Sequence, residues 1–148
     1  MSRAERRLLD IANLLVGGTG LIYAVMKYLI EAADEWAVVN HPWQPHVQHL
    51  HILAAPLLVF VAGAFWKHHV LEGRRGNGSN GRATGLALAI QLVPMVLSGY
   101  LIQVSVAENW RLAWIWVHVI TGGLWCLLVV SHRFHASTGG DEAADSSR

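Results

Sequence analysis

Four apolar runs separated by polar connections dominate the chain. They cover about residues 11–30, 49–69, 85–106 and 112–135. Each run has about 20 residues, the length at which an α-helix crosses roughly 30 Å of hydrocarbon. Because a chain inside lipid must satisfy its own backbone hydrogen bonds, such runs are expected to be helices. The pattern predicts an all-α integral membrane protein, an antiparallel four-helix bundle whose membrane domain covers residues 1–136.

The charged residues of the polar segments set the expected orientation. Lysine and arginine gather at the N terminus, between the second and third runs and after the fourth, at Arg3, Arg6, Arg7, Lys67, Arg74, Arg75, Arg82 and Arg133. The other two connections hold little beyond Lys27 and Arg111. The positive-inside rule therefore predicts a multi-pass protein of the bacterial inner membrane with both termini in the cytoplasm. Residues 137–148 are small and polar, which predicts a disordered tail.

Composition narrows the class further. Of 148 residues, 53% are hydrophobic and only 14% are charged, whereas a soluble domain carries roughly 25% charged residues. The 11 basic and 10 acidic residues nearly balance, so the basic connection is a topology signal and no nucleic-acid partner is expected. The single cysteine, Cys126, lies inside an apolar run, which rules out an intrachain disulfide and covalent haem attachment through Cys-x-x-Cys-His.

Two histidines in the fourth run carry the candidate chemistry. An ionisable side chain within a membrane span is costly and is therefore usually functional. His118 and His132 are 14 residues apart, so their rings are about 40° apart around a helix and roughly 21 Å apart in depth. One metal ion cannot bind both, but two haems stacked across the membrane can. Gly122 and Gly123 would let a flat macrocycle lie against this helix, or would simply allow close helix packing.

Antiparallel spans make the second and fourth helices run in the same direction, which pairs their histidines. His51 and His118 are expected near the outer surface, and His69 and His132 near the inner one. His51 and His69 are 18 residues apart, or five turns, so they face the same way. The two spacings differ by about 6 Å in depth, which a kink at Pro56 or a helix tilt would absorb.

Other histidines remain as alternates. His68 and His135 each follow the outer histidine of their own helix by 17 residues and are alternates for the inner pair; His49 is a third alternate. His41 and His46 lie in the outer connection, where solvated histidine is the simpler interpretation. A single-ion site, such as zinc with closely spaced ligands, is a less favoured use of the histidines around residue 49.

From about Ile11 to His135 the chain resembles the small four-helix dihaem cytochromes b of prokaryotic membranes. That group includes the b-type subunits of formate dehydrogenases and nickel-iron hydrogenases. The resemblance rests on the four spans, the His118-x13-His132 spacing with its glycines, and His51 at the start of the second span. The first span lacks the histidine common in those families, and two histidines on each of two parallel helices is closer to respiratory cytochrome b.

The resemblance implies a function in electron transfer. Two haem b groups would carry electrons between the quinone pool and a partner redox protein, within a lipid environment. The outer connection of residues 31–48, with its acids and tryptophans, is expected to form either an interfacial aromatic belt or a docking face for a periplasmic partner. The alternatives are a haem-free anchor subunit of a larger complex and a small histidine-lined metal transporter.

Overall fold

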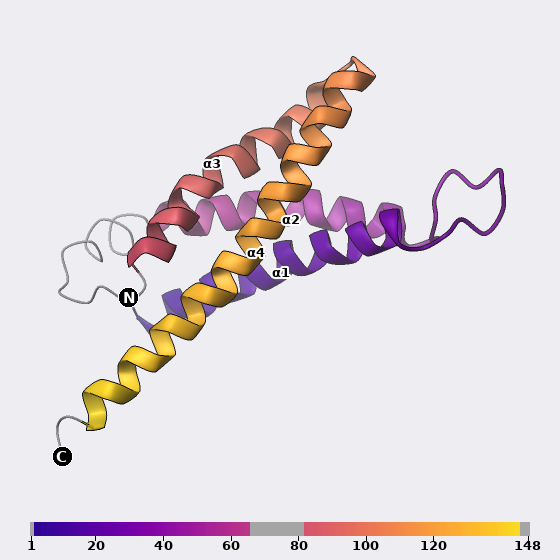
Figure 1. Cartoon of the computed structure of the whole chain (residues 1–148). Helices are drawn as coiled ribbons and strands as arrows, with labels where there is room; N and C mark the ends of the chain where they lie inside the picture. The colour runs from indigo at the N-terminus through magenta and orange to yellow at the C-terminus, as the bar shows by residue number, and fades with distance from the viewer. Residues whose placement is uncertain (1, 66–81, 146–148) are drawn as a thin grey trace. The chain divides into compact units, whose positions relative to one another are not determined.

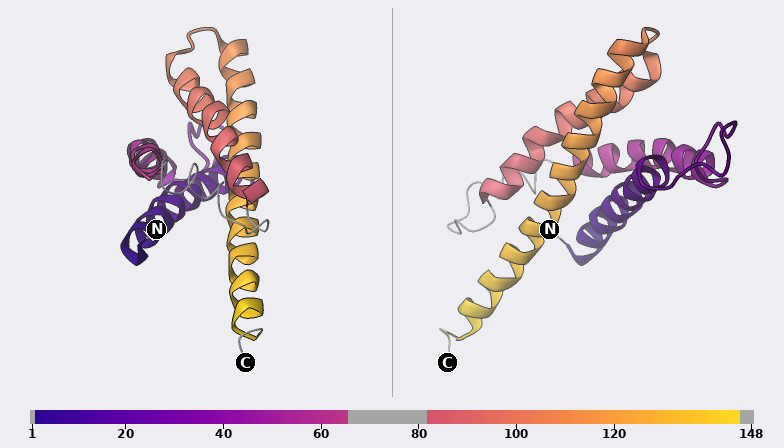
Figure 2. Two further views of the ribbon diagram at one scale, coloured as in Figure 1. Left: turned by 90° about the vertical axis from the view of Figure 1, so that its left-hand side faces the viewer. Right: turned by 45° about the vertical axis from the view of Figure 1, so that its right-hand side comes forward.

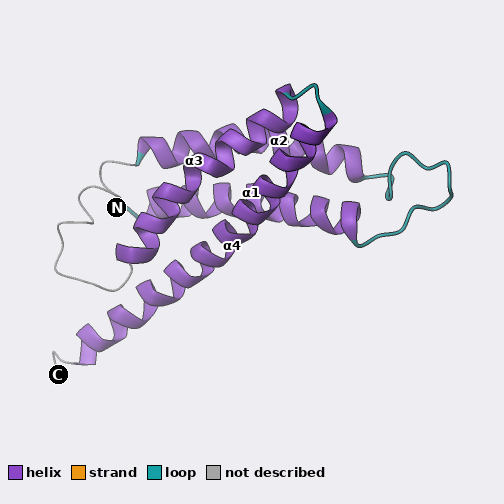
Figure 3. Cartoon of the chain, turned by 45° about the horizontal axis from the view of Figure 1, so that its top comes forward, coloured by secondary structure: helices purple, strands orange, loops and turns teal. Residues whose placement is uncertain are grey.

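The computed structural model of the chain describes residues 2–65 and 82–145, with side chains in the last helix described as far as Arg133. Within these residues all regular secondary structure is α-helical (Figure 3). The helices in chain order are α1 (Arg3–Tyr28), α2 (Gln44–Ala64), α3 (Arg82–Val104) and α4 (Glu108–Asp145). The prediction of an all-α chain with four long helices is therefore confirmed.

Each helix contains a segment long and apolar enough to cross a membrane. These segments are Arg3–Tyr28, Gln44–Ala64, Ala83–Val104 and Glu108–Arg133. Many of their large apolar side chains, such as Leu14 and Leu53, are exposed on the chain itself. Lipid rather than water is the surrounding that suits such surfaces. The chain thus has the helices of a multi-pass membrane protein.

The chain divides into two compact units, Met1–Trp66 and Lys67–Arg148, and each is a helical hairpin. In hairpin 1, α1 packs against α2, and in hairpin 2, α3 packs against α4 (Figures 1 and 2). In both, the two helices run antiparallel because one connection joins their adjacent ends.

Local sequence decides where the helices of hairpin 1 begin. The Ser2 hydroxyl accepts a hydrogen bond from the Glu5 backbone N–H (3.2 Å), and the Glu5 carboxylate accepts one from the Ser2 N–H (2.7 Å). This capping box starts α1 at Arg3, about two turns before the apolar run. Pro45 at the start of α2 likewise allows that helix to begin before residue 49.

Small residues bring the helices of hairpin 1 together. Ala12 and Ala54 are buried between the helices, with Val16, Leu58 and Val61 beside them. Small side chains allow two membrane helices to approach closely, so that dispersion contacts and hydrogen bonds can hold them. This close approach determines which polar groups of α1 and α2 meet.

Hairpin 2 has a shorter connection and a longer second helix. Residues 105–107 join α3 to α4, and the buried side chains include Ala89, Met95, Ser98 and Trp125. Helix α4 continues to Asp145, although the composition of residues 137–148 predicts a disordered tail. Extending an existing helix avoids the unfavourable nucleation step, and Glu142, Ala143 and Ala144 are good helix formers, which favours this continuation.

Candidate functional site

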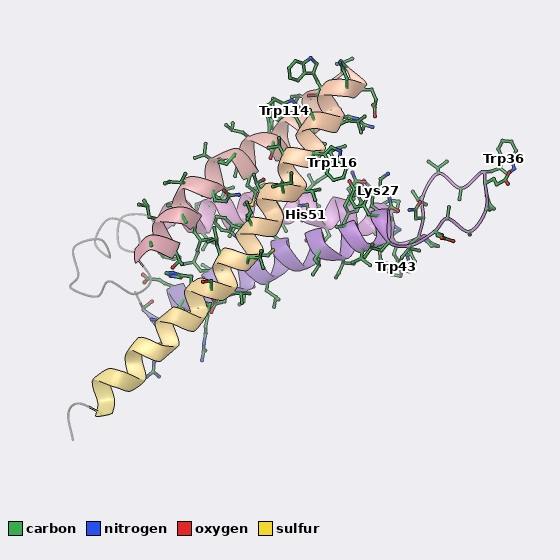
Figure 4. The ribbon with its side chains drawn as sticks, viewed as in Figure 1. Lys27, Trp36, Trp43, His51, Trp114 and Trp116 are labelled. Atoms are coloured by element: carbon green, nitrogen blue, oxygen red, sulfur yellow. The ribbon has the colours of Figure 1, made fainter. Side chains whose placement is uncertain are left out.

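His51 of α2 lies against two polar groups of α1 within hairpin 1 (Figure 4). Its Nδ1 is 3.0 Å from the Val16 carbonyl oxygen and 3.2 Å from the Thr19 hydroxyl oxygen. The Thr19 hydroxyl donates its own proton to carbonyl oxygens one turn back, at Leu15 (2.6 Å) and Val16 (3.1 Å). Both groups that face Nδ1 are thus acceptors, so Nδ1 carries the proton.

His118 of α4 is held in the same way by α3 in hairpin 2. Its Nδ1 is 3.1 Å from the Met95 carbonyl oxygen and 3.2 Å from the Ser98 hydroxyl oxygen. Ser98, only 1% exposed, donates its hydroxyl proton to the Met95 carbonyl oxygen at 3.0 Å. The proton of the neutral imidazole is again fixed on Nδ1, and the lone pair that a metal would bind is on Nε2.

His132 meets a third hydroxyl group farther along the same hairpin. Its Nδ1 is 2.9 Å from the Thr84 hydroxyl oxygen. Thr84 and Ser98 are 14 residues apart on α3, as His118 and His132 are on α4. Equal spacings on antiparallel helices bring both pairs into register, about 21 Å apart along the hairpin. Both rings face α3, which agrees with the shared face that the 14-residue spacing predicts.

Each of these hydroxyl residues is followed directly by glycine. A Cβ on Gly20 would lie 2.9 Å from His51 Cε1, and one on Gly99 would lie 3.0 Å from His118 Cε1. At Gly85 the corresponding distance to His132 Cε1 is 3.5 Å, an ordinary contact. We call each hydroxyl residue and its following glycine a Ser/Thr-Gly cradle. Three cradles are therefore present, at residues 19–20, 84–85 and 98–99.

Sequence reasoning named the three histidines but missed the cradles. A signal was available: the dipeptides Thr84-Gly85 and Ser98-Gly99 repeat the 14-residue interval of the histidines. By itself, however, a Ser/Thr-Gly dipeptide is a common sequence. Only the packing of two helices shows that a hydroxyl group and an imidazole lie at the same depth.

Gly122 and Gly123 have a different environment. A Cβ on either residue would meet no atom within 4 Å. Close packing within hairpin 2 therefore does not explain these glycines. Their predicted place against a flat macrocycle stays a prediction, as does a role in packing against other helices.

The remaining described histidines differ from the cradled ones. The backbone N–H of Trp43 donates to His41 Nδ1 at 3.1 Å, so a neutral His41 carries its proton on Nε2, the opposite tautomer. His46 makes an edge contact with the Trp43 ring at 5.7 Å between centroids, and His49 is exposed. Among the described residues, no three His, Cys, Asp or Glu side chains are placed to hold one metal ion, so the single-ion site is not assembled there.

The outer connection of hairpin 1 is tied to the helix ends. The Asn40 side chain donates to the Lys27 carbonyl oxygen at 2.9 Å, and the Asn40 N–H donates to the buried side chain of Gln44 at 3.1 Å. Farther out, the Asp34 carboxylate accepts from the Trp36 N–H at 2.8 Å. Trp36 lies near the tip of this connection with 89% of its surface exposed (Figure 4). A ring so exposed is available for contact with lipid headgroups or with a protein.

The predicted ligand pairs each involve both hairpins or residues outside the described ranges. His51 and His118 belong to different hairpins, so their pairing stays a prediction. His68, His69 and the side chain of His135 lie outside the described residues. Comparison with protein families, with characterised proteins and with solved structures finds no match.

Proposed function

We propose that this chain is a b-type dihaem membrane cytochrome that transfers electrons between the quinone pool and a partner redox protein. One observation carries the proposal: three histidines within membrane-spanning helices have Nδ1 against an acceptor group or a hydroxyl group of the neighbouring helix. Histidines that bind metals usually donate their other ring N–H to such a partner, which fixes the tautomer and the ring orientation.

The donor set fits haem iron better than the alternatives. Imidazole nitrogen binds iron, and the deep separation of the two sites in hairpin 2 matches two centres rather than one ion. His51 and His118 would bind the outer haem, and His132 would bind the inner haem together with His69 or His68. Open space beside Gly122 and Gly123 would accept a flat ring along α4.

The chemistry divides between the cofactor and the chain. A bound haem supplies the one-electron redox step, and two histidine ligands fill both axial positions, which favours electron transfer over oxygen activation. The chain's own residues hold the proton at Nδ1, aim Nε2 and keep water away by placing the rings inside apolar helices. Cysteine and other soft ligands are not needed for any of these tasks.

Orientation and partners follow from charge. Positive residues at the N terminus and after α4 place both termini in the cytoplasm of a bacterial inner membrane, with the connection of residues 29–43 on the periplasmic side. Its exposed acids, Glu31, Asp34 and Glu35, would steer a positively charged periplasmic redox protein toward the outer haem. Quinone would reach a haem edge from the lipid side.

An absorption spectrum of the purified full-length chain tests the proposal. After expression with sufficient haem, we expect a reduced-minus-oxidised spectrum with a b-type α band and about two haems per chain by pyridine haemochrome assay. The variant His118→Leu should lose one haem and keep the other, and His41→Leu should keep both. A colourless protein would favour a haem-free anchor or a metal transporter, and retention of both haems in His118→Leu would refute the ligand assignment.

A further inference from the structure

We infer that Thr19, Ser98 and Thr84 are positioning residues that lower the reduction potentials of the two haems by strengthening their histidine ligands. This inference rests on the proposed function. It further assigns Thr19 and Ser98, on different hairpins, to the same haem, and Thr84 to the other. Each residue acts through one histidine: Thr19 through His51.

The argument begins with the single proton of each hydroxyl group. Thr19 donates it to Leu15 and Val16, and Ser98 donates it to Met95 within the same helix. What each hydroxyl group offers the imidazole is therefore a lone pair. The backbone carbonyl three residues earlier offers a second lone pair to the same Nδ1–H, at 3.0 Å in hairpin 1 and 3.1 Å in hairpin 2.

Two acceptors on one N–H group have a predictable electronic effect. They draw the Nδ1 proton away from the ring and make Nε2 more basic. A more basic ligand stabilises the more positively charged oxidised iron over the reduced iron. Each cradle should therefore lower the reduction potential of the haem that its histidine binds.

The two hairpins repeat this arrangement. In each one, the first helix supplies the hydroxyl group, the carbonyl group and the glycine, and the second helix supplies the histidine near its N-terminal end. Ligands held in the same way should have similar donor strength. If His51 and His118 are the axial ligands of one haem, losing either hydroxyl group should move the potential of that haem in the same direction and by a similar amount.

A simpler explanation is that these hydroxyl groups only satisfy helix carbonyls, as serine and threonine commonly do in membrane helices. The chain contains a matched example. Thr121 of α4 donates to the carbonyl oxygens of Val117 (2.7 Å) and His118 (3.2 Å), and glycine follows it, but a Cβ on that Gly122 would meet no ring. Thr121 is thus a Thr-Gly dipeptide without a cradled histidine, and Thr121→Val is the control.

The experiment is a redox titration of purified, haem-loaded full-length variants with low-temperature EPR of the low-spin haems. Thr19→Val and Ser98→Ala should each raise the potential of the same haem. Thr84→Val should raise that of the other haem, and Thr121→Val should change neither. Thr19→Ser should restore the wild-type potential. Loss of such an outer partner typically costs about 10- to 100-fold in metal affinity, so haem content is measured at saturating haem.

The outcomes separate this inference from the proposed function. A wild-type chain without haem would overturn the proposed function and the inference together. A haem-loaded wild type in which Thr19→Val and Ser98→Ala behave like Thr121→Val would overturn only the inference. If Thr19→Val fails to insert, Ser98→Ala and Thr84→Val still decide it: equal shifts at one and the same haem would contradict the assignment to two haems.

Discussion

Replacing Gly20 with alanine should displace His51 from its hydrogen bonds. An added methyl group would lie 2.9 Å from His51 Cε1 and 3.3 Å from Nδ1. The shorter distance is about 0.5 Å below the 3.4 Å at which ordinary contact begins. The nearest relief is movement of the ring, since the methyl group is fixed to the backbone of α1. A shift of that size would lengthen the bonds of 3.0 and 3.2 Å from Nδ1 beyond normal hydrogen-bond range.

The magnitude follows from two opposing terms. Alanine favours a helix over glycine by about 1 kcal/mol, whereas forcing a methyl group into a packed site costs about 1–3 kcal/mol. Gly20→Ala should therefore be neutral to about 2 kcal/mol destabilising. Its larger effect should be on haem binding, because a displacement of roughly 0.5 Å is the limit for a preorganised ligand. We expect Gly20→Ala to lower the occupancy of one haem.

Glycines with other surroundings provide a graded series. Gly18 lies on the same helix with nothing within 4 Å of an added Cβ, so Gly18→Ala should gain stability and keep both haems. Gly99→Ala, at 3.0 Å from His118, should resemble Gly20→Ala, and Gly85→Ala, at 3.5 Å from His132, should resemble Gly18→Ala. Haem stoichiometry and denaturant titration in detergent measure both effects. Equal behaviour of Gly20→Ala and Gly18→Ala would refute the steric reasoning.

Two further predictions concern the inner haem and the outer connection. Single leucine substitutions at four histidines should divide into two that abolish the inner haem and two that do not: His68, His69, His132 and His135. We expect His69 and His132 to be the essential pair, and loss from the other two instead would show that both helices use the 17-residue spacing. Neutralising the three outer acids together, at Glu31, Asp34 and Glu35, should slow electron exchange with a basic periplasmic partner at low salt while haem content and potentials stay unchanged. An unchanged rate with that partner would contradict the docking proposal.

The apolar pattern predicted the helices well because membrane spans need length and apolarity more than specific residues. Their ends depended on local chemistry. Ser2 and Glu5 start α1 about two turns before the apolar run, although Ser-x-x-Glu is a readable capping signal. The far end of α4 went the other way, since residues with weak helix preference continue a helix that is already formed.

The candidate site was predictable on one side only. Helical spacing placed His118 and His132 on one face, because angle and rise follow from residue number. The groups that hold them did not follow, since Ser98 and Thr84 meet these rings only through the register between α3 and α4. Register between two membrane helices depends on small-residue packing and hydrogen bonds, without the hydrophobic pattern that guides soluble helices. The same physics leaves pairing between hairpins beyond reach of spacing alone.

The cradles also show that the two hairpins are unequal, which predicts unequal haem sites. Fourteen residues from Ser98 and His118, hairpin 2 has its second cradle at Thr84 and His132. The same step in hairpin 1, from Thr19 and His51, leads to Glu5 and Phe65, which offer no hydroxyl group and no imidazole.

A ligand from hairpin 1 for the inner haem must therefore come from beyond Phe65, at His68 or His69, and cannot share the helical register of the cradled histidines. A ligand outside that register should be held less firmly, so the inner haem should dissociate sooner than the outer one. Transfer of haem from the purified protein to excess apomyoglobin, followed by absorbance, measures both rates. His118→Leu leaves only the inner haem and should lose it rapidly, whereas His132→Leu leaves the outer haem and should retain it. Equal rates in the two variants would mean that hairpin 1 holds its inner ligand as firmly as the cradle holds His51.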